Sequence, residues 1–176
     1  MKKTAGDTRP ESVSRRRPLI RKAACWAMFA GGLAFAQVVP AGEHELNYRL
    51  VTRGIDVKVE KVAEVEGQMV STGRYGGTAV FEDGRIANKE FVFAFDFRKG
   101  AGPFFGYSTY TFTDGSMLVM RFEGTLESGK PMRGEYTVLS GSGIYEGATG
   151  SGYFEKDSEP WEKANLFNGK LSISTP

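Results

Sequence analysis

The chain has 176 residues, 40% of them hydrophobic and 25% charged, which is enough for one domain with its own core. This composition argues against a disordered chain and against a bundle of membrane helices. Residues 1–41 hold eight Lys or Arg and two Asp or Glu, so the formal net charge of +2 becomes −4 for residues 42–176, which keep 15 and 19. An acidic domain of this kind gives no support to a nucleic-acid partner.

The first 41 residues have the layout of an export signal. A basic cluster that ends at Lys22 precedes fourteen small and apolar residues, Ala23–Ala36. This run is shorter than the ~20 apolar residues of a spanning helix, so we expect no stable membrane span once the signal is removed. Ala34–Ala36 and Val39–Ala41 both suit a signal peptidase, so the exported domain, periplasmic or extracellular, would begin at Gln37 or Gly42. Gly42 is favoured because strand-like alternation starts directly after it. The pair Arg16-Arg17 leaves the Sec and twin-arginine routes both open.

The first strand of residues 42–176 shows the period-two pattern that continues along the domain. Leu46, Tyr48 and Leu50 alternate with polar residues and are expected to face the core. Residues 55–62 continue as a second short strand or an irregular crossing. A glycine-rich stretch, 73–77, then separates strand-like residues 68–72 and 78–81. No helical spacing is sustained over three turns, so the pattern predicts an all-β domain.

Residues 90–98 form the clearest strand of the chain. Four phenylalanines at alternate positions, Phe91 to Phe97, project from one face because side chains alternate along a strand. Core packing is the favoured interpretation of such a ladder. The alternative is the wall of a ligand pocket, for which Phe93 and Phe95 are the candidate binding residues.

A tight hairpin is expected at Asp114-Gly115, between strands 107–113 and 116–126. A two-residue turn would place Phe112 opposite Met117 and Tyr110 opposite Val119. One face would then carry Tyr110, Phe112, Met117, Val119, Arg121 and Glu123, and the other Tyr107, Leu118, Met120, Phe122 and Leu126. Tyr107, Tyr110 and Phe112 complete the set of candidate ligand-binding aromatic residues.

Strands at 133–141, 150–156 and 165–173 bring the total to eight to ten, at a spacing that suits an antiparallel meander. Closure into a barrel is favoured because it removes the edge strands that invite aggregation. A two-sheet sandwich remains the alternative.

Few residues in the domain could carry metal or nucleophile chemistry. The sole cysteine, Cys25, lies in the signal, and the only histidine, His44, lies close to the expected mature N-terminus. The glycine-rich segment 140–152 lacks the residues of a phosphate-binding loop and is interpreted as a β-to-β connection. We therefore expect no metal and no cofactor.

Two segments, Phe105–Phe112 with Gly115 and Val138–Gly147, resemble the core of plant allene oxide cyclases and, more distantly, of dirigent proteins. The resemblance spans most of residues 43–173, and its specific part is Gly143–Gly147. It implies a calycin-like, eight-stranded antiparallel barrel whose lumen or mouth holds a hydrophobic small molecule and steers its cyclisation or coupling without a cofactor. The family's proline after the first strand is replaced by Gly54, and its active-site cysteine has no counterpart.

Glu45-Leu46-Asn47 matches the family's Glu-x-Asn pair. By that resemblance Glu45 and Asn47 are the candidate catalytic residues, the first acting on the reacting group and the second helping to hold a water. This role requires both side chains in the lumen, whereas the period-two pattern places them outside.

Two functions therefore stay open for the exported barrel. One is binding of a hydrophobic small molecule, with or without cofactor-free isomerisation or cyclisation. The other is a non-catalytic structural or interaction barrel of the cell envelope, its interior filled by phenylalanines. A homo-oligomer is compatible with both.

Overall fold

The computed structural model describes residues 42–158 and 161–176, so the predicted export signal and its cleavage site lie outside the described part. The described residues form eight strands and one short 3₁₀ helix, η1. Their bounds are β1 (Gly42–Lys61), β2 (Gln68–Phe81), β3 (Ile86–Arg98), β4 (Gly102–Phe112), β5 (Met117–Leu126), β6 (Arg133–Ser142), η1 (Gly143–Tyr145), β7 (Thr149–Lys156) and β8 (Asn165–Thr175).

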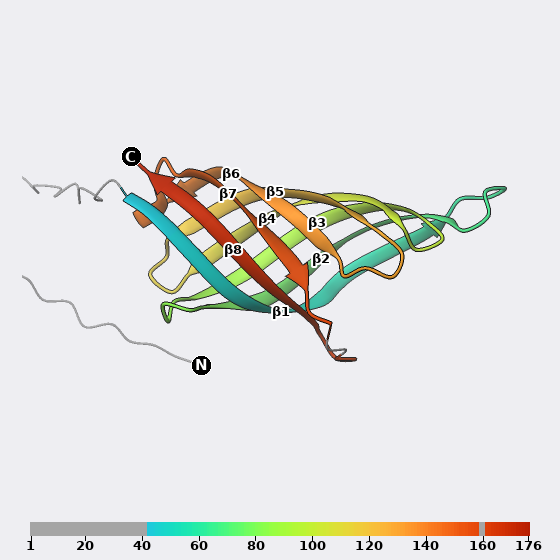
Figure 1. Ribbon diagram of the computed structural model, residues 1–176, viewed down its shortest axis with the longest axis horizontal. Coiled ribbons are helices and arrows are strands. Elements are labelled where there is room, and N and C mark those ends of the chain that lie inside the picture. The colour runs from blue at the N-terminus through green and yellow to red at the C-terminus, as the bar shows by residue number, and fades with distance from the viewer. Residues whose placement is uncertain (1–41, 159–160) are drawn as a thin grey trace, which may run out of the picture. The chain divides into compact units, whose positions relative to one another are not determined.

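The strands form one closed antiparallel barrel in chain order, with β1 paired to both β2 and β8 (Figure 1). The all-β prediction and the barrel are confirmed, and the sandwich alternative is wrong. Residues 42–61 form a single long strand rather than two, with a register irregularity between Gly54 and Asp56. In the described residues no helix has the length and apolar character needed to cross a membrane.

The hairpin between β4 and β5 has a three-residue loop instead of the expected two. The backbone N–H of Phe112 donates to the carbonyl of Ser116 at 2.9 Å, and Gly115 adopts φ +85°. Tyr110 consequently lies opposite Leu118, not Val119. A one-residue shift exchanges the two faces of a strand, so the predicted grouping is wrong and β5 sends its apolar residues inward.

The barrel interior is solidly packed in the half that contains the C-terminal end of β8. Glycines make room for large rings there: a Cβ added at Gly169 would lie 2.2 Å from Cζ of Tyr48. The packed half consists largely of inward residues from β1, β2, β4, β5, β6, β8 and the η1 region: Leu46, Tyr48, Phe81, Tyr110, Phe112, Leu118, Met120, Val138, Tyr145, Leu171 and Ile173.

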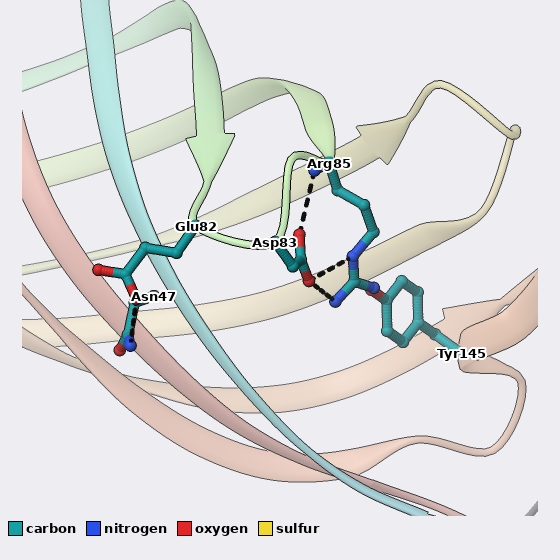
Figure 2. A network of polar contacts seen from close by, with 5 residues as sticks. All are labelled: Asn47, Glu82, Asp83, Arg85 and Tyr145. Carbon is teal, nitrogen blue, oxygen red and sulfur yellow. Dashed lines mark hydrogen bonds and ion pairs between the residues drawn. The ribbon is translucent and has the colours of Figure 1, made fainter.

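Tyr145 closes the packed half. It is 1% exposed, and its ring centroid lies 5.0 Å from that of Phe112. Figure 2 shows Arg85 between the Asp83 carboxylate and the Tyr145 hydroxyl, to which it donates a hydrogen bond. The hydrogen bonds from Arg85 lower the pKa of Asp83. The segment Gly143–Gly147, on which the family resemblance rested most, thus forms the structural cover of the filled end.

Candidate ligand-binding cavity

The other half of the barrel encloses a cavity of about 200 Å³. Because the inward positions of all strands converge here without filling the space, side chains distant in sequence share one apolar wall. Nine of the fifteen described residues that line it are aromatic: Tyr75, Phe91, Phe93, Phe95, Phe104, Phe122, Tyr136, Phe154 and Phe167.

Lys89 lies at the inner end of this cavity, on the border with the packed half. It occupies the same face of β3 as Phe91 and Phe93, and only 3% of it is exposed. Its Nζ donates a hydrogen bond to the Tyr136 hydroxyl at 2.5 Å. Nζ also lies 4.8 Å from the ring centroids of both Tyr110 and Tyr136. The amine is therefore held among aromatic faces instead of in water.

Three phenol groups form the polar floor beneath Lys89. Tyr110 donates its hydroxyl hydrogen to the Tyr48 oxygen at 2.8 Å, and the Tyr48 hydroxyl lies 3.5 Å from that of Tyr136. Burial raises the pKa of Tyr48 to about 12 and those of Tyr110 and Tyr136 well above their usual value. All three are neutral hydroxyls at physiological pH.

The charged groups among the described residues that line the cavity are both lysines. Burial lowers the pKa of Lys89 to about 7, because a charged amine is costly to remove from water. Lys156, which is exposed, is the second charged group of the lining, and no carboxylate belongs to the described lining residues. No carboxylate within residues 42–158 and 161–176 forms an ion pair with Lys89.

The structure brings two of the five predicted ligand-binding residues to the cavity. Phe93 and Phe95 form part of its wall. Tyr110 is completely buried beneath Lys89 and reaches the site through the phenol floor. Phe112 packs in the filled half, and Tyr107 lies on the outer surface, 46% exposed. Neither of these two residues lines the cavity, because Phe112 lies too far along β4 and Tyr107 has the outward parity of that strand.

Glu45 and Asn47 lie on the outside of the barrel. Glu45 pairs with Lys170 and accepts a hydrogen bond from Ser172 at 2.5 Å; these hydrogen bonds lower its pKa. Asn47 Nδ2 donates to the Glu82 carboxylate at 2.8 Å (Figure 2). β1 turns Leu46 and Tyr48 inward, so the lumen position expected from the cyclase resemblance is wrong and the period-two pattern is confirmed.

Removing the Glu45 and Asn47 side chains should leave the cavity unaltered. We expect Glu45→Ala and Asn47→Ala to bind an apolar probe such as octan-1-ol with an affinity within about twofold of the parent, as is usual for exposed positions away from a site. Titration calorimetry measures this. A loss of tenfold or more in either variant would contradict the assignment of the site to the interior.

Lys89 is the functional candidate that the sequence analysis missed. The sequence does indicate its direction: Lys89 precedes Phe91 by two residues, so its side chain lies on the same face of the strand as the phenylalanine ladder. As for metals, no group of three His, Cys, Asp or Glu side chains converges within the part of the chain that the structure describes.

Comparison with known proteins identifies a similar fold but not a function. No family model matches the sequence, and no curated protein matches it significantly. The pterocarpan synthase dirigent protein GePTS1 superposes with a TM-score of 0.54 at 12% identity, covering 76% of this chain and 88% of the other. PsPTS1, a second pterocarpan synthase dirigent protein, gives 0.50 at 13% identity, covering 77% and 95%.

A protein of unknown function from the DUF3224 family of Shewanella oneidensis is 16% identical over 78% of this chain and 99% of its own, with a TM-score of 0.39. At such identities the similarity to the two dirigent proteins concerns the architecture and not the activity. Residues 42–176 therefore have the barrel fold of the dirigent proteins.

Proposed function

We propose that this protein is an exported barrel that binds a small hydrophobic molecule in the aromatic cavity. The observation that carries the proposal is the contrast between the two halves of the interior. One half is packed around Tyr48 and Tyr110, whereas the other leaves about 200 Å³ between phenylalanines. Export is supported by the basic cluster and the apolar run that precede Gly42.

The size and lining of the cavity indicate what would fit. Ligand sites are typically concave and mostly apolar, with few polar groups that fix orientation. This cavity matches that lining, with Lys89 and Tyr136 as the orienting groups, and its volume of about 200 Å³ is smaller than the roughly 300–1,000 Å³ of sites for drug-sized ligands. Each Å² of apolar ligand surface removed from water contributes roughly 25 cal/mol. A short alkyl chain or a small ring system suits the space.

Cofactor-free isomerisation or cyclisation is a second candidate, favoured by the position of Lys89, whose amine is buried at the inner end of the cavity and hydrogen-bonded to the Tyr136 hydroxyl. Burial lowers the pKa of Lys89 to about 7, which suits release and uptake of a proton near neutral pH. Binding is the prerequisite for such chemistry and is therefore tested first.

Filling the cavity should abolish binding. Thr52 faces inward on β1, is 1% exposed and lines the cavity. We expect Thr52→Phe to weaken octan-1-ol binding by about tenfold or more, because the new ring occupies the ligand's space. Thr52→Val is the matched control and should bind within about threefold of the parent, since valine has nearly the shape of threonine and the buried Thr52 hydroxyl makes no hydrogen bond within the described residues.

Calorimetry and native mass spectrometry with octan-1-ol measure both variants, and circular dichroism checks that they are folded. Saturable binding that Thr52→Phe removes and Thr52→Val retains supports the proposal. A parent protein that binds no apolar probe contradicts it and favours the structural barrel of the cell envelope.

A further inference from the structure

The described residues that line the cavity carry an unbalanced positive charge. Lys89 contributes a nearly completely buried amine, and Lys156 adds a second positive group at the exposed rim. The remaining polar groups near Lys89 are hydroxyls of Tyr48, Tyr110 and Tyr136, each of which can donate a hydrogen bond. None of the described lining residues is a carboxylate, so none of them neutralises the positive charge of Lys89.

We infer that the ligand carries a carboxylate at one end, which pairs with Lys89 while its apolar part lies in the cavity against Phe93 and Phe95. This inference rests on the proposed function and specifies the chemical class of the ligand. The arrangement explains why a lysine is placed at the inner end of an otherwise aromatic cavity: it sets both the orientation of the ligand and the identity of its polar group.

Physical chemistry favours an anion over a neutral head group at this position. A buried ammonium without a counter-charge is costly, and aromatic faces offset only part of that cost. Four rings lie within 5.9 Å of Nζ: those of Phe91, Tyr110, Tyr136 and Phe154. A ligand carboxylate would complete an ion pair and could also accept a hydrogen bond from a phenol, as a buried pair requires.

The pH dependence of carboxylate binding follows from the same groups. Below pH 7 Lys89 is already protonated, whereas at higher pH binding of an anion requires uptake of a proton. The groups facing Nζ are Tyr48 from β1, Tyr110 from β4 and Tyr136 from β6, with the rings of Phe91 and Phe154, and Lys156 at the rim. The three tyrosines have raised pKa values and do not titrate below pH 9. Octanoate affinity should therefore fall by up to about tenfold per pH unit above 7.

Three probes of equal chain length test the inference: octanoate, octan-1-ol and octylamine, titrated into the full protein at pH 6.5 and pH 8.5. Transfer into purely apolar surroundings favours the alcohol over the ionised acid. We expect the reverse at pH 6.5, with octanoate binding about tenfold more tightly than octan-1-ol and octylamine more weakly than either. Octan-1-ol affinity should not change with pH.

Two variants show which lysine causes the preference for octanoate. Lys89→Met keeps an unbranched side chain, one atom shorter and without the charge, and should remove the preference for octanoate over octan-1-ol and its pH dependence. Lys156→Met, at the exposed rim, should keep the preference. If Lys89→Met does not fold, the pH profile of the parent protein still decides the question.

Octan-1-ol binding equal to or tighter than octanoate binding at pH 6.5 would overturn the inference while leaving the proposed function intact. Failure of all three probes would instead refute the proposed function. A preference that persists in Lys89→Met and disappears in Lys156→Met would assign the carboxylate to the rim and also overturn the inference.

Discussion

Lys89→Met should stabilise the barrel by on the order of 3 kcal/mol at pH 6. At this pH Lys89 is protonated in both the folded and the unfolded chain, so the folded state bears the full cost of the buried charge. The pKa falls from the ordinary 10.5 to about 7 on folding, and each unit of such a shift corresponds to about 1.4 kcal/mol. The surrounding rings and the lost hydrogen bond to Tyr136 reduce the net gain from methionine.

The advantage of the variant should disappear as the pH rises. Between pH 7 and about 10.5 the unfolded chain binds a proton at Lys89 and the folded chain does not, so the stability of the parent increases with pH. The expected slope is about 1.4 kcal/mol per pH unit relative to Lys89→Met. Measurements should stop near pH 9, because ionisation of the unfolded tyrosines opposes folding above that value.

Urea unfolding of both proteins at pH 6, 7, 8 and 9 measures this difference. Lys156→Met is the matched control, since its side chain is exposed and should show no comparable dependence on pH. A parent whose stability relative to Lys89→Met is constant across this range would show that Lys89 is not a desolvated amine.

Tyr145→Ala should destabilise the barrel by roughly 3 to 5 kcal/mol, the usual cost of deleting a large buried ring. Tyr145 is 1% exposed and packs against Phe112 at the filled end of the barrel. Its hydroxyl accepts a hydrogen bond from Arg85. Tyr145→Phe keeps the ring and should lose only about 1 kcal/mol. Urea denaturation gives both values.

The neighbouring Ile144 supplies the control for this prediction. It is 40% exposed, so Ile144→Ala should change the stability little. Because η1 lies at the opposite end of the barrel from the cavity, Tyr145→Phe should also leave octan-1-ol affinity unaltered. Equal losses of stability in Ile144→Ala and Tyr145→Ala would contradict a structural role for the Tyr145 ring.

Much of the fold follows directly from the sequence because strands leave a period-two pattern. The pattern correctly places Leu46, Tyr48 and Leu50 inside, and it identifies the ladder from Phe91 to Phe97 as one face. It fails at the β4–β5 hairpin, where the register depends on whether the loop contains two or three residues. Asp114-Gly115 is compatible with both loop lengths, and the backbone hydrogen bond between Phe112 and Ser116 decides between them.

The candidate site was only partly predictable. Phe93 and Phe95 could be named from the ladder, but whether a phenylalanine packs or lines a cavity depends on partners from other strands. Because lysine is rarely buried, Lys89 was not among the candidate residues predicted from the sequence, although its position in the alternating pattern points inward. Its partner Tyr136 lies 47 residues away on β6, and only closure of the barrel brings the two together.

The family resemblance predicted the barrel architecture correctly. It was wrong about β1, because it placed Glu45 and Asn47 in the lumen. The segment Gly143–Gly147, on which the resemblance rested most, covers the filled end of the barrel. Glu45 and Asn47 match a three-residue pattern, yet their contacts are with Lys170 and Glu82 on the outer surface. A short motif on a strand says little about chemistry until the direction of its side chains is known.

A crystal structure of the protein with 8-bromooctanoate would test the account most directly, because anomalous scattering locates the bromine without ambiguity. We predict the bromine peak in the aromatic cavity near Phe95 and Phe167, with the carboxylate at Lys89 Nζ. A bromine peak confined to the outer surface, with the interior of the barrel empty of ligand, would contradict it.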